Sequence, residues 1–156
     1  MRDIKLSENF WLSEFVKSGT ADRRGIDNWP ESDEIIDNLK RLCDEILQPL
    51  RYAFETPIYV SSGYRCLELN RAIGSKDTSQ HTKGQAVDFE IAGIPNKEVA
   101  EFIRDNFQFD QLILEFWYEE DANSGWIHCS YVSPAKNRGQ CLTINKHGVF
   151  NGFRSQ

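Results

Sequence analysis

Histidine, methionine and cysteine are all scarce in this chain of 156 residues. The chain has three histidines, one methionine and four cysteines. The cysteines form no C-x-x-C pair, and a chain of this length buries a core without cross-links, so we expect reduced thiols. A site with two imidazole ligands can contain only two of the three histidines His81, His128 and His147.

Long apolar runs and an excess of positive charge are also missing. Apolar stretches such as residues 112–117 are far shorter than the roughly 20 residues of a membrane helix. The N-terminal residues Arg2, Asp3 and Lys5 precede no apolar signal core. Lys and Arg number 18 against 24 Asp and Glu, a net charge of -6 that offers no diffuse basic surface to phosphates. We expect no membrane span, no nucleic-acid partner, and synthesis in the cytoplasm without a secretion signal.

The hydrophobic share of 40% is enough for one compact domain, whereas two domains would each be undersized. We expect a single domain over residues 1–156, with residues 1–30 as an N-terminal arm packed on the rest. An apolar stripe at three- and four-residue steps, capped by Ser32, predicts a helix that reaches Leu50. Further helices are predicted over 68–73 and 96–107, the second with Asn96 as its cap.

Strands are indicated by short β-prone runs. In residues 85–91 apolar and polar residues alternate, so that Asp88 faces away from Val87 and Phe89. The polar residues 119–125 separate two β-rich runs and predict a hairpin. The predicted strands are residues 58–60, 85–91, 111–118, 126–132 and, more weakly, 141–144. The fold class is therefore α+β, a small antiparallel sheet flanked by helices.

The segment that carries chemistry has the sequence SQHTKGQAVD, residues 79–88. It places His81 on a loop and Asp88 on the polar face of the next strand. Imidazole and carboxylate both suit zinc, and a catalytic zinc keeps three protein ligands and one open position. His128, inside an apolar strand, is a better third ligand than His147 in a polar turn. The sheet is thus expected to carry a Zn²⁺ site.

A catalytic zinc also needs a proton acceptor, usually a carboxylate. If the hairpin loop is centred after Asp121, Glu115 lies directly across from His128 on the same face. Glu115 interrupts an apolar run, where a carboxylate is costly unless it has a partner or a task. We therefore predict Glu115 as the catalytic base, against a structural salt bridge. Glu119, Glu120 and Asp121 are the alternatives.

These residues resemble the zinc-binding pattern of D-Ala-D-Ala carboxypeptidases and L-alanyl-D-glutamate endopeptidases. The pattern is Ser79-x-His81-x-x-Gly84-x-Ala86-x-Asp88, followed by Trp126-x-His128. Lysostaphin-type peptidases and the hedgehog signalling domain belong to the same broad group. Residues 9–28 and the Ser-Ser-Gly-Tyr-Arg turn at 61–65 extend the resemblance to the small, single-domain branch found in phage and bacterial genomes.

The resemblance implies a hedgehog-like fold and a zinc peptidase that hydrolyses a bond next to a D-amino acid in peptidoglycan stem peptides. It implies that His81, Asp88 and His128 hold Zn²⁺ and that Arg65 and Ser79 bind substrate. We expect a monomer that acts on the cell wall after release or export, as a phage lysis or virion-associated enzyme does.

Two aromatic residues, Tyr64 and Trp126, are further candidates to line the substrate groove. One position departs from the family, because many members carry the catalytic glutamate in a Glu-x-x-His motif where this chain has Gly125. That departure keeps a second hypothesis open, a catalytically silent zinc-stabilised module that binds cell wall or a protein. A thiol hydrolase using Cys129 is disfavoured, because strand neighbours such as Cys129 and His128 point to opposite faces.

Overall fold

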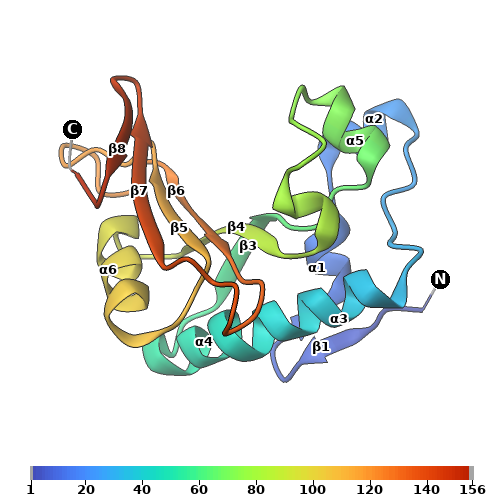
Figure 1. Ribbon diagram of the computed structural model, residues 1–156, viewed down its shortest axis with the longest axis horizontal. Helices are drawn as coiled ribbons and strands as arrows, with labels where there is room; N and C mark the ends of the chain where they lie inside the picture. Colours follow the sequence, from blue (N-terminus) through green and yellow to red (C-terminus); the bar gives the residue numbers. More distant parts are fainter. Residues whose placement is uncertain (1, 155–156) are drawn as a thin grey trace.

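The computed structural model describes residues 2–154, which form helices and two sheets (Figure 1). The helical elements are α1 (Leu12–Val16), α2 (Gly19–Arg24), α3 (Asp33–Leu42), the π-helical turn η1 (Cys43–Leu47), α4 (Gln48–Phe54), α5 (Leu67–Ala72), the 3₁₀ turn η2 (Gln80–Lys83) and α6 (Asn96–Asn106). The strands are β1 (Lys5–Ser7), β2 (Phe10–Trp11), β3 (Ile58–Ser62), β4 (Ala86–Ile91), β5 (Gln111–Glu115), β6 (Trp126–Ser130), β7 (Gln140–Asn145) and β8 (Gly148–Asn151).

The predicted helix after Ser32 is confirmed, and it forms the long helical stretch along the lower side of Figure 1. The Ser32 hydroxyl accepts a hydrogen bond from the Glu34 amide at 3.1 Å, which caps α3. The helical path continues through η1 into α4 and ends at Glu55, whose φ is 50°. Within residues 2–154, no helix has both the length and the apolar character that crossing a bilayer requires.

The α+β class is confirmed, and the larger sheet has the strand order β3-β4-β6-β5-β7-β8. Its strand pairs are antiparallel except β5 and β7, which run parallel, so the sheet is mixed. The weak strand predicted at 141–144 is β7, whereas β8 is not among the predicted strands. Since β8 is short and largely exposed, it has no strong apolar pattern that marks it as a strand.

The two faces of the sheet differ as the alternation in β4 predicts. Val87 and Phe89 are fully buried and belong to the hydrophobic core, together with residues of α3, η1 and α6. Asp88 and Glu90 are half-buried on the opposite face. In β6, His128 lies on this second face and its neighbours Ile127 and Cys129 are buried in the core. One sheet face therefore stabilises the fold, and the other presents polar groups.

The N-terminal arm fixes the turn that follows β3. Phe15 of α1 is fully buried, and a Cβ at Gly63 would lie 2.7 Å from the Phe15 carbonyl oxygen, so only glycine fits there. The amide of Asn28 donates to the carbonyl oxygens of Val16 at 2.9 Å and Tyr64 at 3.0 Å. Contacts from one end of the chain thus hold a turn that lies about fifty residues later.

The β5–β6 hairpin is present, but its predicted register is wrong by two residues. Ile113, not Glu115, is the partner of His128, and Glu115 pairs with Trp126. The ladder ends at that pair because the next residue on each strand has a positive φ, 53° at position 116 and 69° at position 125. An even shift keeps the side-chain direction, so Glu115 stays on the face that carries His128.

Candidate metal centre

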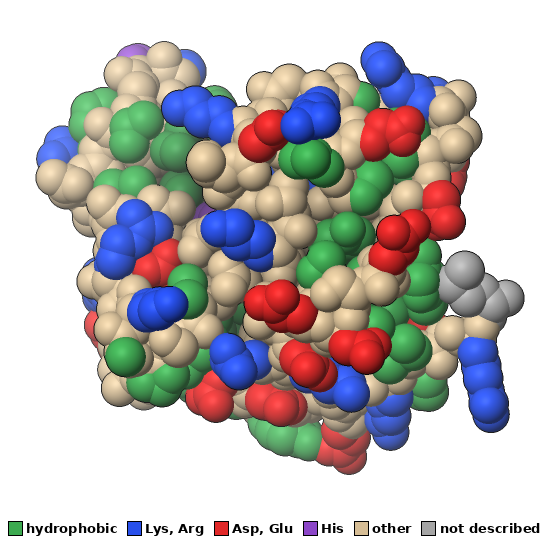
Figure 2. All heavy atoms as spheres, turned by 45° about the vertical axis from the view of Figure 1, so that its right-hand side comes forward, with side chains coloured by type: hydrophobic (Ala, Val, Ile, Leu, Met, Phe, Trp, Pro, Cys, Tyr) green, Lys and Arg blue, Asp and Glu red, His purple; other side chains and the backbone are tan. Residues whose placement is uncertain are grey.

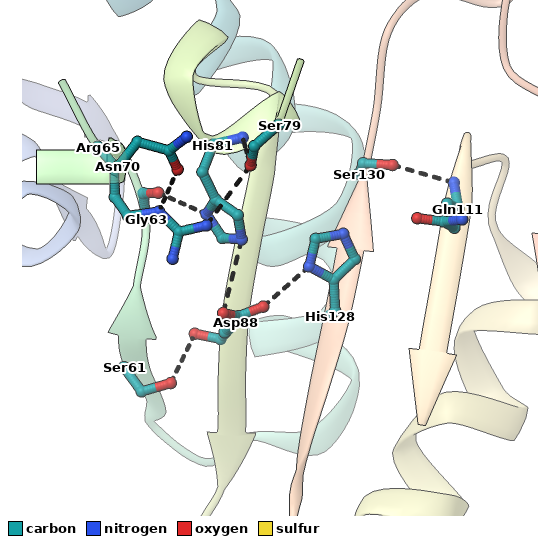
Figure 3. Close-up of polar contacts among 10 residues, drawn as sticks. All are labelled: Ser61, Gly63, Arg65, Asn70, Ser79, His81, Asp88, Gln111, His128 and Ser130. Carbon is teal, nitrogen blue, oxygen red and sulfur yellow. Dashed lines mark hydrogen bonds and ion pairs between the residues drawn. The ribbon is translucent and has the colours of Figure 1, made fainter. Parts of the chain in front are cut away.

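The three predicted metal ligands lie together on the polar face of the sheet (Figure 3). Asp88 on β4 and His128 on β6 are partners in adjacent strands, and His81 comes from η2 just before β4. The Oδ1 atom of Asp88 is 2.9 Å from Nδ1 of His128, and its Oδ2 atom is 3.5 Å from Nε2 of His81. One donor atom from each residue falls within 4.8 Å of the other two.

The orientation of His81 is set by the backbone. Its Nδ1 atom lies 2.7 Å from the carbonyl oxygen of Gly63, and because a carbonyl only accepts, this nitrogen carries the proton. The lone pair is then on Nε2, which faces Asp88. Metal-binding histidines are commonly held in this way by a carbonyl behind the ring. Two nitrogens and one oxygen are a set of donors that fits a catalytic Zn²⁺.

The Asp88 carboxylate is strongly favoured in its ionised form. Burial raises the pKa of Asp88, but the adjacent imidazoles of His128 and His81 outweigh that effect and bring the pKa well below its ordinary value. The carboxyl group is therefore charged at neutral pH, as a metal ligand must be.

Arg65 and Ser79 lie beside this centre and contact each other. Arg65 donates from Nε to Oδ1 of Asn70 at 3.1 Å and from Nη2 to Oγ of Ser79 at 3.5 Å, while its backbone amide donates to the carbonyl oxygen of His81. In residues 2–154 the guanidinium forms no ion pair. Burial lowers the pKa of Arg65, and the negative charges of Asp88 and Glu115 oppose that shift. The side chain is thus positioned by neutral groups next to the carboxylates.

Glu115 lies at the end of β5, half-buried, within electrostatic reach of the candidate metal ligands. Burial raises the pKa of Glu115, and the charge of Asp88 raises it further. His128, a hydrogen-bond interaction with Trp126, and Arg65 partly offset this increase. Glu115 is therefore an electrostatic neighbour of Asp88, His128 and Arg65. The pairing of the hairpin strands alone did not establish this proximity.

The two aromatic candidates occupy different positions. Trp126 is half-buried, and its ring centroid lies 5.6 Å from that of Phe116. Tyr64 is only 7% exposed and belongs to the core, but it also lines a cavity of about 210 Å³ with Arg65 and Lys17. Both residues border the site, and their contact with substrate stays a prediction.

Two asparagines that sequence reasoning missed support the site. Asn28 accepts from the Cys66 amide at 2.7 Å and donates to the carbonyl oxygen of Tyr64, so it holds both ends of the turn that contains Arg65. Asn70 is fully buried and connects Arg65 to the carbonyl oxygen of Lys76. The burial of Asn70 is what distinguishes it from an ordinary polar residue of a short helix, and burial is not visible in the sequence.

The alternative nucleophile, metal ligand and bases considered in the sequence lie away from the candidate metal centre or in the core. Cys129 is buried on the core face, where burial raises the pKa of its thiol, and none of the four cysteines is paired. His147 lies in the exposed turn between β7 and β8 and is not part of the His81–Asp88–His128 group. The alternative bases Glu119, Glu120 and Asp121 are exposed in the β5–β6 loop. None of these residues belongs to the His81–Asp88–His128 group.

A hollow lies between raised parts of the surface in Figure 2, with a histidine side chain partly visible inside it and Lys or Arg side chains nearby. The side chains of His128 and Asp88 keep 14% and 15% of their surface exposed, so two of the candidate ligands are accessible from solvent.

Comparison with known proteins identifies the family. The model of the family described as Peptidase M15 matches residues 8–130. A search of curated proteins gives no match. The matched part includes the whole site from Arg65 to His128. The chain therefore belongs to the Peptidase M15 family of zinc peptidases.

Proposed function

We propose that the chain is a zinc peptidase that hydrolyses a bond next to a D-amino acid in peptidoglycan stem peptides. Family membership supports the peptidase class, and the sequence resemblance to D-Ala-D-Ala carboxypeptidases and L-alanyl-D-glutamate endopeptidases supports the substrate. The observation that carries the proposal is the position of Glu115. A carboxyl group with a raised pKa lies on the sheet face of Asp88 and His128, and Arg65 is among its electrostatic neighbours.

Each part of this group has a role in peptide hydrolysis. When bound by His81, Asp88 and His128, Zn²⁺ supplies a Lewis acid that polarises the scissile carbonyl and activates water. Glu115 takes a proton from the attacking water and delivers it to the leaving amine. Burial suits Glu115 to this exchange, because a raised pKa makes its carboxylate a stronger base toward the proton of the attacking water.

Arg65 and Ser79 orient the substrate in this proposal. A guanidinium has five N–H donors, and Arg65 uses two side-chain donors, one to Asn70 and one to Ser79. The others suit a substrate carboxylate, which a guanidinium grips with two parallel bonds, or the carbonyl under attack. The hydroxyl of Ser79 offers a further polar contact at the same place.

The backbone at Gly125 explains why the general base is not in the usual family position. Gly125 has a φ of 69°, and a Cβ there would lie 2.0 Å from the carbonyl oxygen of Glu115. A glutamate at position 125 is incompatible with this hairpin, so the base comes from another position. The same departure favours the second candidate function, a silent zinc-stabilised module that binds cell wall or a protein partner.

Replacement of Glu115 by glutamine tests the proposal. Glu115→Gln keeps the shape of the side chain and removes the base, so cleavage of purified muropeptides should fall by about 100-fold to 10,000-fold with zinc content unchanged. Glu45→Gln, an exposed residue of η1, is the matched control and should keep full activity. Products and zinc are measured by mass spectrometry.

Other outcomes of this experiment are equally informative. Undiminished cleavage by Glu115→Gln would remove Glu115 from the mechanism. The wild-type protein could instead bind purified cell wall without forming any zinc-dependent cleavage product, as judged by digests with and without a chelator. That result would support the silent module and overturn the peptidase proposal.

A further inference from the structure

An acidic cavity lies between the segment that joins α2 to α3 and the turn that begins α5, two parts of the chain labelled in Figure 1. Its volume is about 410 Å³. The carboxylates of Asp27, Glu31 and Glu68 line it, and the lining contains no Lys or Arg side chain of the described residues. It also contains none of the candidate metal ligands and neither Arg65 nor Glu115. The acidic cavity is therefore a feature distinct from the metal centre.

The three carboxylates of the acidic cavity are not neutralised within residues 2–154, where none of them forms an ion pair. Asp27 accepts one hydrogen bond, from the Trp29 amide at 3.1 Å. All three carboxylates are exposed at the rim. Because an exposed carboxylate attracts a cation only weakly by itself, a site here also needs contacts from the cavity walls.

The walls of the acidic cavity are aromatic and apolar. They include the half-buried Trp29 and Ile35, the buried Tyr64, and Leu67, which is 42% exposed. The face of an aromatic ring attracts a cation, tryptophan most strongly, and apolar walls accept the methylene groups of a ligand. The three carboxylates are too far apart to form a metal-binding group in the described residues. The walls and rim thus favour an organic cation over a metal ion.

The hydroxyl of Tyr64 is an independent sign of a missing ligand. Tyr64 is 7% exposed, and its hydroxyl has no hydrogen-bond partner in the part of the chain that the structure describes. The oxygen is not among the atoms that lack both a partner and accessible surface, so a ligand in the cavity can reach it. A largely buried hydroxyl without a partner is unfavourable, and a ligand with N–H groups would satisfy its oxygen.

The electrostatic neighbours of the Tyr64 hydroxyl show which cavity it faces. Burial raises the pKa of Tyr64, and Cys66 and Glu31 raise it further. Both of these residues line the acidic cavity, and neither lines the neighbouring cavity that Tyr64 shares with Lys17 and Arg65. The hydroxyl is therefore protonated at neutral pH and directed toward the carboxylates.

We propose that the acidic cavity binds an organic ammonium group carried on an apolar stem. The N–H donors of the ammonium group match the carboxylates of Glu31 and Glu68 and the phenolic oxygen of Tyr64. The ring of Trp29 lies beside the stem and the charge. A lysine side chain of a peptide and a free polyamine both carry this group. The site goes beyond the proposed function, since it uses neither Zn²⁺ nor the proposed base.

The test uses two small probes, N-acetyl-lysine amide and N-acetyl-norleucine amide, of which only the first has an ammonium group. NMR titration of wild type should give saturable amide shifts within residues 27–35 and 64–68 for the lysine probe. The norleucine probe should bind at least about 10-fold more weakly, because it lacks the charge and the donors. Equal affinities for the two probes, or no saturable shift with the lysine probe, would overturn the proposal.

Variants assign the contacts. Glu31→Gln combined with Glu68→Gln should weaken the lysine probe at least about 5-fold, and Tyr64→Phe should weaken it about 3-fold. The matched control combines Glu45→Gln with Glu98→Gln, which removes the same charge from exposed positions outside the cavity and should leave the affinity unchanged. An unchanged affinity in the Glu31 and Glu68 double variant, or an equal loss in the control, would contradict the proposed site.

Two further probes distinguish the sources of the ammonium group. Tighter binding of the peptide Gly-Lys-Gly than of spermidine would support a lysine side chain as the ligand, and the reverse order would support a polyamine. Because the readout is binding, a protein that cleaves no muropeptide can still confirm the site, so its outcome is separate from that of the proposed function.

Discussion

The site has two halves that are held in place by different means. The strand half contains Asp88 and His128, which are partners in neighbouring strands and are positioned by the backbone ladder of the sheet. The turn half contains Arg65, Ser79 and His81, which lie in or beside non-repetitive segments around α5 and η2. A few side-chain hydrogen bonds position this half. We infer that single polar substitutions disturb the turn half more than the strand half.

Loss of a metal ligand from either half should have the largest effect. His81→Ala and His128→Ala each leave two donors, too few for a catalytic zinc site, so peptidase activity should fall at least about 1,000-fold. Zinc content, measured by mass spectrometry of the intact protein, should fall in parallel. Full zinc content in either variant would show that the removed histidine is not a ligand.

The difference between the halves predicts unequal effects of two other substitutions. Asn70→Ala removes the partner of the Arg65 Nε atom, so KM should rise about 10-fold and stability should fall by about 1–3 kcal/mol. Ser61→Ala on β3 removes a hydroxyl that donates to the Asp88 carbonyl oxygen at 3.2 Å, but the ladder still holds the strand. Its effect on stability should stay within about 0.5 kcal/mol.

Steady-state kinetics and urea unfolding measure both variants. Zinc content should be unchanged in each, because neither side chain is a ligand. Equal effects of the two substitutions would contradict the distinction between the halves.

A further effect concerns the contacts that connect the two halves, and it depends on pH. Asp110, just before β5, accepts from Nε2 of Gln80 at 2.9 Å and from Nη2 of Arg138 at 2.8 Å. Hydrogen bonds from Arg138 are the main cause that lowers the pKa of Asp110 to about 2. Since the folded pKa is below the unfolded one, the stabilisation is complete above about pH 4 and is lost as the pH falls toward 2.

Asp110→Asn tests this bridge. At neutral pH it should cost about 2 kcal/mol of unfolding free energy, and the difference from wild type should shrink between about pH 4 and 2. Thermal unfolding at a series of pH values measures both. A constant difference down to pH 2 would show that another group causes the acid sensitivity.

Much of the site was predictable because its residues lie close together in the sequence or follow a strand alternation. His81 and Asp88 are seven residues apart, and the alternation in residues 85–91 correctly placed Asp88 away from Val87. His128 followed from the small number of histidines. The sequence did not reveal Asn28 or Asn70, because their importance lies in contacts with distant backbone groups.

In the β5–β6 hairpin, the local pattern predicts the correct sheet face for Glu115 although the predicted strand pairing is wrong. The alternation in β5 and β6 fixes which side each residue faces, but the loop geometry fixes the pairing. Phe116 adopts a positive φ that its residue type does not predict, and the ladder ends early. The predicted face of Glu115 is correct only because the register differs by two residues, an even number that preserves the side-chain direction.

The sequence by itself determined the α+β class, the long capped helix, the polar face of β4 and the three candidate ligands, because these depend on periodicity and on residue chemistry. Only the tertiary structure decided the parallel pairing of β7 with β5, the turn around Arg65, and the acidic cavity beside Tyr64. These features arise where segments far apart in the chain meet, and their contact energies depend on distances that no local pattern contains.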